Sequence, residues 1–293
     1  MPEPTTTDTS AAHASTLETR ERQLLELLAG LGRVAVAFSG GVDSSYLLAA
    51  ALDALGRERV VALTADSPLL PRAERDTAVE VARLLGADHR LIPFDDLAIA
   101  GVVENSPQRC YYCKRARFEA LRALVREAAE ASSGEAVLVH GENVDDADDF
   151  RPGAVAAREL GVRAPLVEAG LSKADIRALS RRRGLPTWDH PAAACLASRF
   201  PYGTPLTREG LERVERAESA LQTVAGLRQV RVRDHYPVAR IEAPPQEIAR
   251  LAAPDLRRRI HDAIVAAGYR YVTLDLLGYR MGSLNEGIEE PGR

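Results

Sequence analysis

Cysteine is scarce in this chain of 293 residues, which has three, an odd number and too few for a disulfide scaffold. No apolar run approaches membrane-spanning length, and the N-terminal stretch lacks a hydrophobic segment that could act as a signal. Positive charge is not in excess: the formal net charge of -4 argues against a general nucleic-acid-binding surface, though not against a local basic cleft. These absences predict a cytoplasmic protein. Apolar residues make up 46% of the chain, enough for the cores of two ordinary domains.

One stretch, from Val34 to Leu52, joins an apolar run of buried-strand length to a helix-forming run. Small and polar residues line the turn between the two runs: Ser39, Gly40, Gly41, Asp43, Ser44 and Ser45. The glycines let the backbone bend tightly and approach a ligand, and the polar residues open the helix. Free N–H groups at a helix N-terminus form an anion site. Because Asp43 would repel a bare phosphate there, we expect Mg²⁺ to bridge the two.

Three kinds of phosphate-binding loop compete for this stretch, and spacing separates them. A Walker loop requires a lysine after its second glycine, and no lysine follows Gly41. A dinucleotide fingerprint requires three spaced glycines, whereas only two adjacent ones occur. Residues 39–44, SGGVDS, instead resemble the pyrophosphate loop (PP-loop) of the ATP pyrophosphatase family, whose members cleave ATP to AMP and pyrophosphate. A glycine turn with a helix cap is the plainer alternative.

Strands alternate with helices along the first part of the chain. The expected strands cover residues 34–38, 60–65, 89–94 and 136–140, and the expected helices 17–31, 72–85, 114–131 and 155–160. This alternation predicts an α/β fold, with a Rossmann-like parallel sheet in an ATP pyrophosphatase domain over residues 17–185. Ligands of such sheets bind beyond the carboxyl ends of the strands, so Ser39, Thr64 and Asn143 are expected to share one nucleotide. Residues 1–16 are expected to form a disordered tail.

The alternation changes in the last third of the chain. A short strand over 164–168 and a helix that begins near Ser172 are expected to close the first domain, and residues 186–205, rich in Pro, Ala and Gly, to form a hinge. The elements expected beyond the hinge are a helix over 207–224, strands over 229–234 and 238–242, a helix over 254–267 and a strand over 271–274. This order predicts a second, smaller α+β domain over 206–284 for substrate or subunit contacts, followed by a polar tail over 285–293.

An acidic loop follows the strand that is expected to end at His140. Four carboxylates lie between Asp145 and Asp149. Asn143 and Asp146 are the best candidates to hold Mg²⁺ on the ATP phosphates, because they lie nearest the strand end. A solvated acidic loop has the same sequence pattern, and both interpretations stay open.

The three cysteines fall into two groups. Cys195 lies in the stretch 190–203, with Arg199 four residues later. If this stretch is helical, Arg199 shares a face with Cys195, and a nearby cation raises the thiolate fraction. A small, buried cysteine is the plainer interpretation. Cys110 and Cys113 are separated by two tyrosines, a spacing that in a reducing compartment indicates metal or redox chemistry.

Four segments, SGGVDSS, RCYYCK, GENVDDADDFRPG and LPTWDHPAAACLASRFPYG, occur in the order of the LarE family, and the chain resembles that family over residues 18–280. Its members are ATP-dependent sulfur transferases that help to make the nickel-pincer cofactor of lactate racemase. The resemblance implies that ATP adenylates a carboxylate of pyridinium-3,5-dicarboxylic acid mononucleotide, with release of pyrophosphate. A sulfur nucleophile then displaces AMP to give a thiocarboxylate. In many members the residue matching Cys195 is this nucleophile and gives up its own sulfur.

The pair Cys110 and Cys113 resembles the three-cysteine branch of that family. This resemblance implies that the pair and Cys195 hold a 4Fe-4S cluster, whose fourth iron lacks a protein ligand and can carry a transferable sulfide. Cys195 would then not be consumed. A zinc site or a redox pair remain alternatives for the two-residue spacing.

The phosphate of the implied substrate requires cations. Arg231 and Arg233 alternate along an expected strand and therefore share one face. Arg199 is a further candidate for a ligand contact. A strand face turned to solvent gives the same alternation, so the sequence leaves this point open.

Three rival functions remain open at this stage. A tRNA thiolation enzyme shares the ATP loop but needs a basic surface for RNA. The negative net charge of this chain argues against such a surface. A ligase such as NAD synthetase would give the cysteines no role, and a nucleotide-binding module would show no turnover. The expected partners are ATP and the small-molecule substrate, without nucleic acid or membrane. The resemblance also implies a homo-oligomer, a hexamer.

Overall fold

The computed structural model describes residues 7–131, 136–148, 152–191 and 194–280 of the chain. The chain divides into two compact units. The first unit comprises residues 1–67, 72–94 and 110–193, and the second comprises residues 68–71, 95–109 and 194–293. Each unit is described by itself. No helix among the described residues is both long enough and apolar enough to cross a membrane.

A parallel sheet of four strands forms the centre of the first unit. Its order is β3-β2-β1-β4, and its strands are β1 (Val34–Ala37), β2 (Val60–Asp66), β3 (Asp88–Pro93) and β4 (Val137–His140). All three neighbouring pairs are parallel, and β1 pairs with β2 on one side and with β4 on the other. The predicted α/β fold with a parallel, Rossmann-like sheet is therefore confirmed. The carboxyl ends of the strands meet at one edge, where the predicted nucleotide residues follow them.

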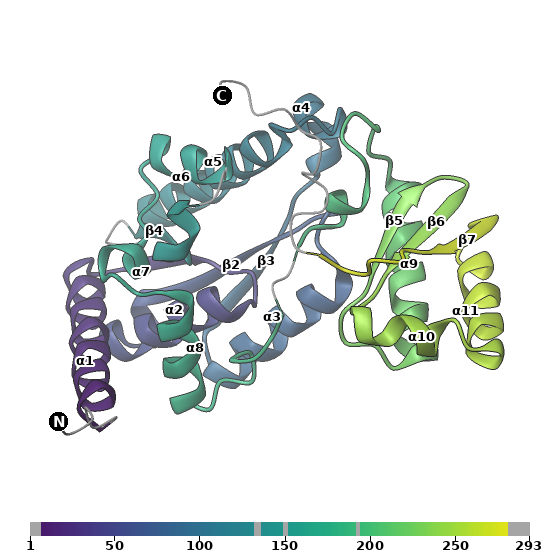
Figure 1. Ribbon diagram of the computed structural model, residues 1–293. Helices are drawn as coiled ribbons and strands as arrows, with labels where there is room; N and C mark the ends of the chain where they lie inside the picture. The colour runs from purple at the N-terminus through teal and green to yellow at the C-terminus, as the bar shows by residue number, and fades with distance from the viewer. Residues whose placement is uncertain (1–6, 132–135, 149–151, 192–193, 281–293) are drawn as a thin grey trace, which may run out of the picture. The chain divides into compact units, whose positions relative to one another are not determined.

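Helices cover both faces of this sheet (Figure 1). The helices are α1 (Thr7–Gly30), α2 (Val42–Leu55), α3 (Arg72–Leu85), α5 (Arg109–Ala131), α6 (Pro152–Glu159), α7 (Pro165–Glu168) and α8 (Lys173–Arg182). On one face, Val34 and Val36 of β1 share a core with α1, α2, α3 and α8. On the other face, Ala35 of the same strand shares a second core with α5 and α6. Alternate residues of β1 are thus buried on opposite faces, as expected for the central strand of a parallel sheet.

Three expected elements differ from the structure. Helix α1 begins at Thr7, so the tail expected over residues 1–16 is largely helical, and residues 1–6 lie outside the described residues. The strand expected over 164–168 is instead helix α7, whose first residue is Pro165, a residue suited to open a helix. Helix α5 begins at Arg109 and not at Lys114, which places the cysteine pair inside its first turns.

The second unit contains a three-stranded sheet, β5-β6-β7, in which β5 pairs antiparallel and β7 pairs parallel to β6. Its strands are β5 (Arg231–His235), β6 (Val238–Glu242) and β7 (Tyr271–Leu274), and its helices are α4 (Ala100–Val103), α9 (Arg208–Ala225), α10 (Ile248–Leu251) and α11 (Pro254–Ala266). Leu221 of α9 and Ile264 of α11 pack with Val232 and Ile241 of the sheet. The element order agrees with the sequence-based one, whereas the domain boundaries at 185, 206 and 284 stay predictions. Residues 285–293, the expected polar tail, lie outside the described residues.

Candidate active site

The loop between β1 and α2 is held so tightly that two glycines near it have no space for a side chain. Gly40 has a φ of +76°, and a Cβ there would lie 2.7 Å from Cα of Ala78 in α3. Gly141 follows β4, and a Cβ there would lie 2.8 Å from the backbone nitrogen of Ser44. Both distances are below van der Waals contact. The sequence indicated the first glycine by its motif but gave no sign of the second contact, which joins loops from separate strands.

Two hydroxyl groups brace the PP-loop from within. The Ser44 hydroxyl donates to the Gly41 carbonyl over 3.3 Å and lies 3.0 Å from the Ser39 hydroxyl. The backbone N–H of Ser39 donates back to Ser44 Oγ over 3.3 Å. Gly41 caps α2 without any side-chain hydrogen bond, so the first turn of this helix keeps N–H groups available for an anion.

Asp43 has one engaged and one unengaged carboxylate oxygen. Its Oδ2 accepts from the Lys173 ammonium over 2.7 Å and from the Asn143 amide over a longer 3.4 Å. Its Oδ1 is buried and has no hydrogen-bond partner among the described residues. Burial raises the pKa of Asp43 above its usual value, and the contact with Lys173 offsets part of that rise.

Asp43 Oδ1 suits a cation that takes most of its other ligands from water and substrate. No group of three or more His, Cys, Asp or Glu side chains in the described ranges could hold a metal ion by itself. Mg²⁺ does not need such a group, because it retains waters and binds through one or two carboxylates plus substrate phosphates. The donor set at the PP-loop therefore suits Mg²⁺ bound together with ATP.

The loop after β4 is ordered around a buried amide. Asn143 donates to Asp146 Oδ2 from its amide over 3.0 Å and from its backbone over 3.1 Å. Asp145 accepts from the backbone N–H of Lys173, at the start of α8, over 2.8 Å. These two carboxylates are thus structural partners of the site and are not simply solvated. Asp149 lies outside the described residues.

Thr64 lies at the same edge of the sheet, but its hydroxyl forms hydrogen bonds with other residues of the protein. Its hydroxyl donates to the Phe38 carbonyl over 2.7 Å and lies 2.8 Å from His89 Nε2. Because the single hydroxyl proton points to Phe38, His89 must be the donor in the second contact. Burial lowers the pKa of His89, which favours the neutral form of the ring. The geometry favours a role for Thr64 in fixing the end of β1, one residue before the PP-loop.

Cys110 and Cys113 lie in the first turns of α5, three residues apart and so on one face of the helix. Cys110 is exposed and Cys113 is half-buried. None of the three cysteines, all of which the structure describes, forms a disulfide. Cys195 belongs to the second unit, whereas this pair belongs to the first.

Cys195 precedes a short 3₁₀ turn, Leu196–Arg199, so the helical stretch that would place Arg199 on its face is not formed. Arg199 instead holds the backbone. Its Nη1 donates to the carbonyls of Ala194 and Cys195 over 2.7 and 3.0 Å. Its Nε and Nη2 donate to both oxygens of Glu218 over 2.9 and 2.8 Å. Burial lowers the pKa of Arg199, but the charge and hydrogen bonds of Glu218, together with the charges of Cys195 and Tyr279, raise it above the usual value.

Two further arginines lie beside this pair on β5. Arg233 donates to the Ser198 carbonyl and to Glu242, each over 2.6 Å, and is buried. Arg231 is half-buried, and burial followed by the charge of Arg199 lowers its pKa. The sequence placed both arginines on one strand face, and the structure adds two buried carboxylates, Glu218 and Glu242, which are ion-paired.

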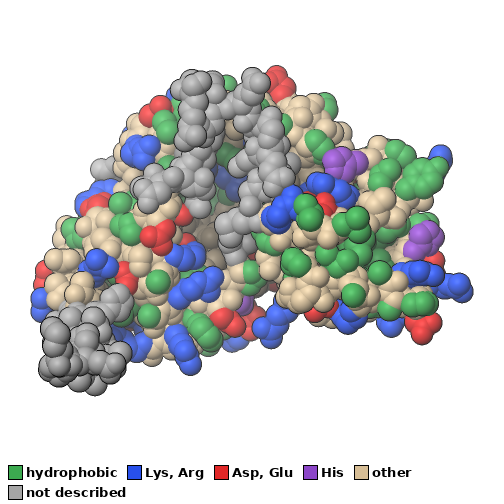
Figure 2. Space-filling model, viewed as in Figure 1, with side chains coloured by type: hydrophobic (Ala, Val, Ile, Leu, Met, Phe, Trp, Pro, Cys, Tyr) green, Lys and Arg blue, Asp and Glu red, His purple; other side chains and the backbone are tan. Residues whose placement is uncertain are grey.

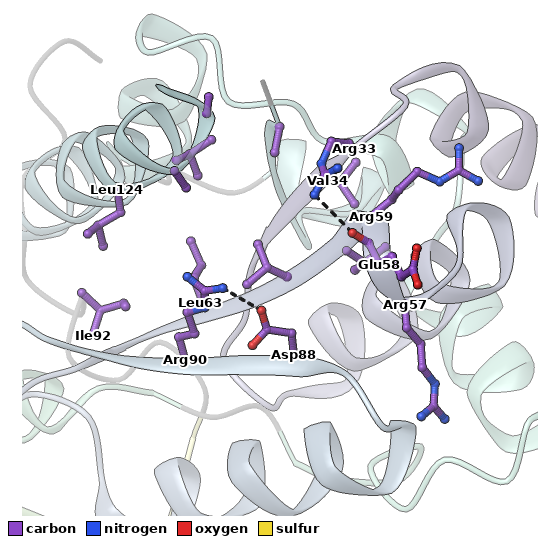
Figure 3. A pocket seen from close by; sticks show the side chains of 16 residues that line it. Arg33, Val34, Arg57, Glu58, Arg59, Leu63, Asp88, Arg90, Ile92 and Leu124 are labelled. Carbon is purple, nitrogen blue, oxygen red and sulfur yellow. Dashed lines mark hydrogen bonds and ion pairs between the residues drawn. The ribbon is translucent and has the colours of Figure 1, made fainter. Parts of the chain in front are cut away.

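A pocket of about 450 Å³ in the first unit is not part of this site (Figure 3). Its lining includes Arg33, Val60 and Asp88, which lie where β1, β2 and β3 begin. Arg90 donates to Asp88 within it over 2.8 Å. Since the PP-loop follows the opposite end of β1, this pocket lies at the wrong edge of the sheet for the nucleotide.

Comparisons with known proteins identify relatives along most of the chain. The family model described as asparagine synthase matches residues 25–137, which include the PP-loop. The pyridinium-3,5-bisthiocarboxylic acid mononucleotide synthase of Lactiplantibacillus plantarum is 39% identical over 274 residues, 94% of this chain and 96% of that protein. An uncharacterised protein of Synechocystis is 40% identical over 269 residues, 92% of this chain and 98% of that protein. An argininosuccinate synthase of Natronomonas pharaonis is 30% identical over 164 residues, 53% of this chain and 40% of that protein.

Proposed function

Because the chain belongs to the LarE family of ATP-dependent sulfur transferases, we propose that it converts pyridinium-3,5-dicarboxylic acid mononucleotide to a thiocarboxylate in nickel-pincer cofactor biosynthesis. A free carboxylate is a poor electrophile without a leaving group. Transfer of AMP from ATP to the carboxylate supplies one and releases pyrophosphate. A sulfur nucleophile then attacks the acyl carbon, and AMP departs with the carboxylate oxygen.

One observation carries the ATP-dependent step: a buried Asp43 oxygen, with no hydrogen-bond partner among the residues that the structure describes, lies at the start of a helix whose N–H groups are available. The N–H groups and the PP-loop bind phosphate oxygens, and Asp43 binds the Mg²⁺ that accompanies them. Asn143 and Asp146 keep the neighbouring loop in place beside Asp43. Mg²⁺, when bound, neutralises charge on the pyrophosphate that leaves.

The second unit supplies the cations for the phosphate of the mononucleotide. Arg231 and Arg233 share one face of β5 and lie near Arg199. Arg199 and Arg233 each already hold a buried carboxylate and a backbone carbonyl. The half-buried Arg231 is therefore the better ligand for the phosphate, and Arg199 and Arg233 are its support.

The thiols of Cys110, Cys113 and Cys195 are the donor type that a 4Fe-4S cluster requires, and two of them fall on one helical face. The pair and Cys195 belong to separate units, so the cluster is part of this proposal and not of the structure. A cluster, when bound, would provide the sulfide without loss of protein sulfur. In its absence Cys195 is the nucleophile, and its Cβ–S bond breaks after transfer to leave dehydroalanine.

Pyrophosphate release tests the function directly. The purified protein with Mg²⁺ and ATP should release pyrophosphate when the pyridinium mononucleotide is supplied, and neither tRNA nor ammonia with a carboxylate substrate should replace it. Release that depends on tRNA would identify the thiolation enzyme instead. Absence of pyrophosphate with every acid would overturn the proposal.

Mass spectrometry and absorbance separate the two sulfur sources. Anaerobic reconstitution with iron and sulfide should give cluster absorbance in the wild-type protein and much less in Cys110→Ser, Cys113→Ser and Cys195→Ser variants. Wild-type protein without absorbance would exclude the cluster. A mass loss equal to H₂S, confined to Cys195 after turnover, would then identify this residue as the consumed donor.

We further propose that the protein works in the cytoplasm as a homo-oligomer, a hexamer as in the family. Light scattering coupled to size-exclusion chromatography tests the subunit number. A monomer at micromolar concentration would contradict this part of the proposal and leave the chemistry untouched.

A further inference from the structure

Asn105, in the second unit, adopts a backbone conformation that favours glycine. Its φ is +54°, and no other residue except glycine has a positive φ in the part of the chain that the structure describes. Asparagine tolerates this region better than most residues, but glycine occupies it without steric cost. Asn105 is also fully buried, so its side chain must form contacts that a glycine would lack.

The side-chain amide of Asn105 joins two segments that are far apart in the sequence. Its Nδ2 donates to the Pro201 carbonyl over 2.8 Å, and its Oδ1 accepts from Nη1 of the buried Arg109. An amide both donates and accepts, whereas a carboxylate only accepts and a glycine has no side chain to do either. All three residues belong to the second unit, so these contacts lie within it.

Two further contacts join the same segments. The backbone N–H of Gly203 donates to the Asn105 carbonyl over 3.0 Å. The Arg109 guanidinium lies 4.8 Å from the centroid of the Tyr202 ring, within the range of a cation–π contact. The loop that follows Cys195 is thus held to the segment that ends at Arg109.

Both of the joined segments adjoin cysteines. Arg109 is the first residue of α5, and Cys110 is the second. Pro201 lies six residues after Cys195, with the short 3₁₀ turn Leu196–Arg199 between them. A hydrogen bond at Pro201 therefore restricts the positions that the Cys195 thiol can take.

We propose that Asn105 is a positioning residue for sulfur transfer. Its amide holds the loop that carries Cys195 to the residue that precedes Cys110, and so keeps the thiols in the arrangement that delivers sulfur. Without the amide this loop would open locally more often, and water would attack the activated carboxylate before sulfur does. The inference rests on the proposed sulfur transfer, but not on whether a cluster or Cys195 supplies the sulfur.

Alkylation of Cys195 tests this role without any substrate. Cys110→Ser together with Cys113→Ser leaves Cys195 as the single thiol of the chain. In this background, Asn105→Gly suits the same φ but lacks the amide. Asn105→Asp keeps an acceptor for the guanidinium but cannot donate to the carbonyl. Each should raise the rate of reaction with uncharged iodoacetamide by about tenfold, roughly the contribution of one hydrogen bond.

Thr273→Val is the matched control for the alkylation rates. It removes a side-chain hydrogen bond of 3.0 Å to the Ala239 carbonyl, in the same unit but in its sheet. The alkylation rate of Cys195 should change by less than about twofold in this variant. A wild-type rate in either Asn105 variant overturns the inference. An equal rise in Thr273→Val also overturns it, because the rate would then follow overall stability.

Product analysis adds a readout that a purely structural role would not move. In a single turnover of the otherwise wild-type chain, Asn105→Gly should lower thiocarboxylate formation by about tenfold. Pyrophosphate release should stay within about twofold, because the PP-loop belongs to the first unit and keeps its own hydrogen bonds. A parallel fall in both products overturns the inference. Failure of the wild-type protein to release pyrophosphate would instead remove the proposed function, and the alkylation rates would still decide whether Asn105 positions Cys195.

Discussion

Asp43 combines burial, an ion pair and an orphaned oxygen in a single side chain. The sequence predicted its role from its place after two glycines, but it could not predict Lys173, which lies 130 residues further along. Such a contact depends on how α8 packs beside α2, and neither motif spacing nor periodicity encodes that packing. The sequence thus predicted the role of Asp43 in the PP-loop, but it did not predict that Lys173 is the partner of Asp43.

Replacing Asp43 tests the residue that should bring Mg²⁺ to ATP. Asp43→Asn should lower pyrophosphate release by about a hundredfold or more, because the amide is a weak ligand for Mg²⁺ and carries no charge. Asp53→Asn on the same helix is the matched control, since this exposed carboxylate pairs with Arg183 at the far end of α2. Steady-state pyrophosphate release measures both. Wild-type release by Asp43→Asn would show that Mg²⁺ binds elsewhere.

The buried pair of Arg199 and Glu218 should be costly to break. Arg199→Met should lower the free energy of unfolding by about 3 to 5 kcal/mol, because it leaves Glu218 as an unpaired charge in the interior. Arg22→Met removes an exposed ion pair with Glu26 on α1 and should change the free energy of unfolding by less than about 0.5 kcal/mol. Urea unfolding of both variants measures the difference. Similar midpoints would show that Arg199 contributes no more than a surface charge.

His140 should make the protein sensitive to acid. Burial, followed by the charge of Lys114, lowers its pKa to about 3, so the folded protein leaves it neutral where the unfolded chain protonates it. Stability should therefore fall as pH drops from about 6.5 towards 3, by linkage. His140→Gln should flatten this slope, and His261→Gln, at an exposed position, should not. Urea unfolding at several pH values measures the free energy of unfolding against pH. The same slope in His140→Gln as in the wild-type protein would contradict the prediction.

The elements that were correctly predicted are those with a strong local signal. Strand β7 and helix α3 have the expected limits, because apolar alternation and helical spacing define them clearly. Helix α7 was missed because its four residues are too few to show a period, and its first residue, Pro165, also suits an extended segment. The start of α5 was missed because the cysteine pair was interpreted as a metal or redox motif and not as part of the helix.

Gly40 allows a prediction at the level of the β1–α2 connection. Gly40→Ala should abolish ATP binding and destabilise the protein, because the new Cβ would lie 2.7 Å from the backbone of α3. Gly32→Ala has nearly the same positive φ but nothing within 4 Å, so it should cost only the backbone strain, about 1 to 2 kcal/mol. Thermal unfolding and ATP titration compare the two. Equal effects would show that the close approach to α3 is unimportant.

At the scale of the whole molecule, the formal charge balance is slightly acidic. Figure 2 shows Lys and Arg side chains interspersed with Asp and Glu over the face in view. With a formal net charge of -4, such a surface gives little of the phosphate attraction on which RNA binding depends. The protein should therefore form no stable complex with tRNA at physiological salt in a filter-binding assay. Submicromolar binding of tRNA that weakens steeply with salt would instead favour a tRNA thiolation enzyme.

The hydrogen bonds around position 195 have a consequence for the life of the enzyme. Arg199 donates to the carbonyl oxygens of residues 194 and 195, and Ser198 also donates to that of residue 195. These hydrogen bonds hold the backbone and do not involve the Cys195 side chain. If Cys195 is the sulfur donor, a molecule that has lost this thiol would therefore keep the same backbone geometry and would still bind its nucleotides without turning them over.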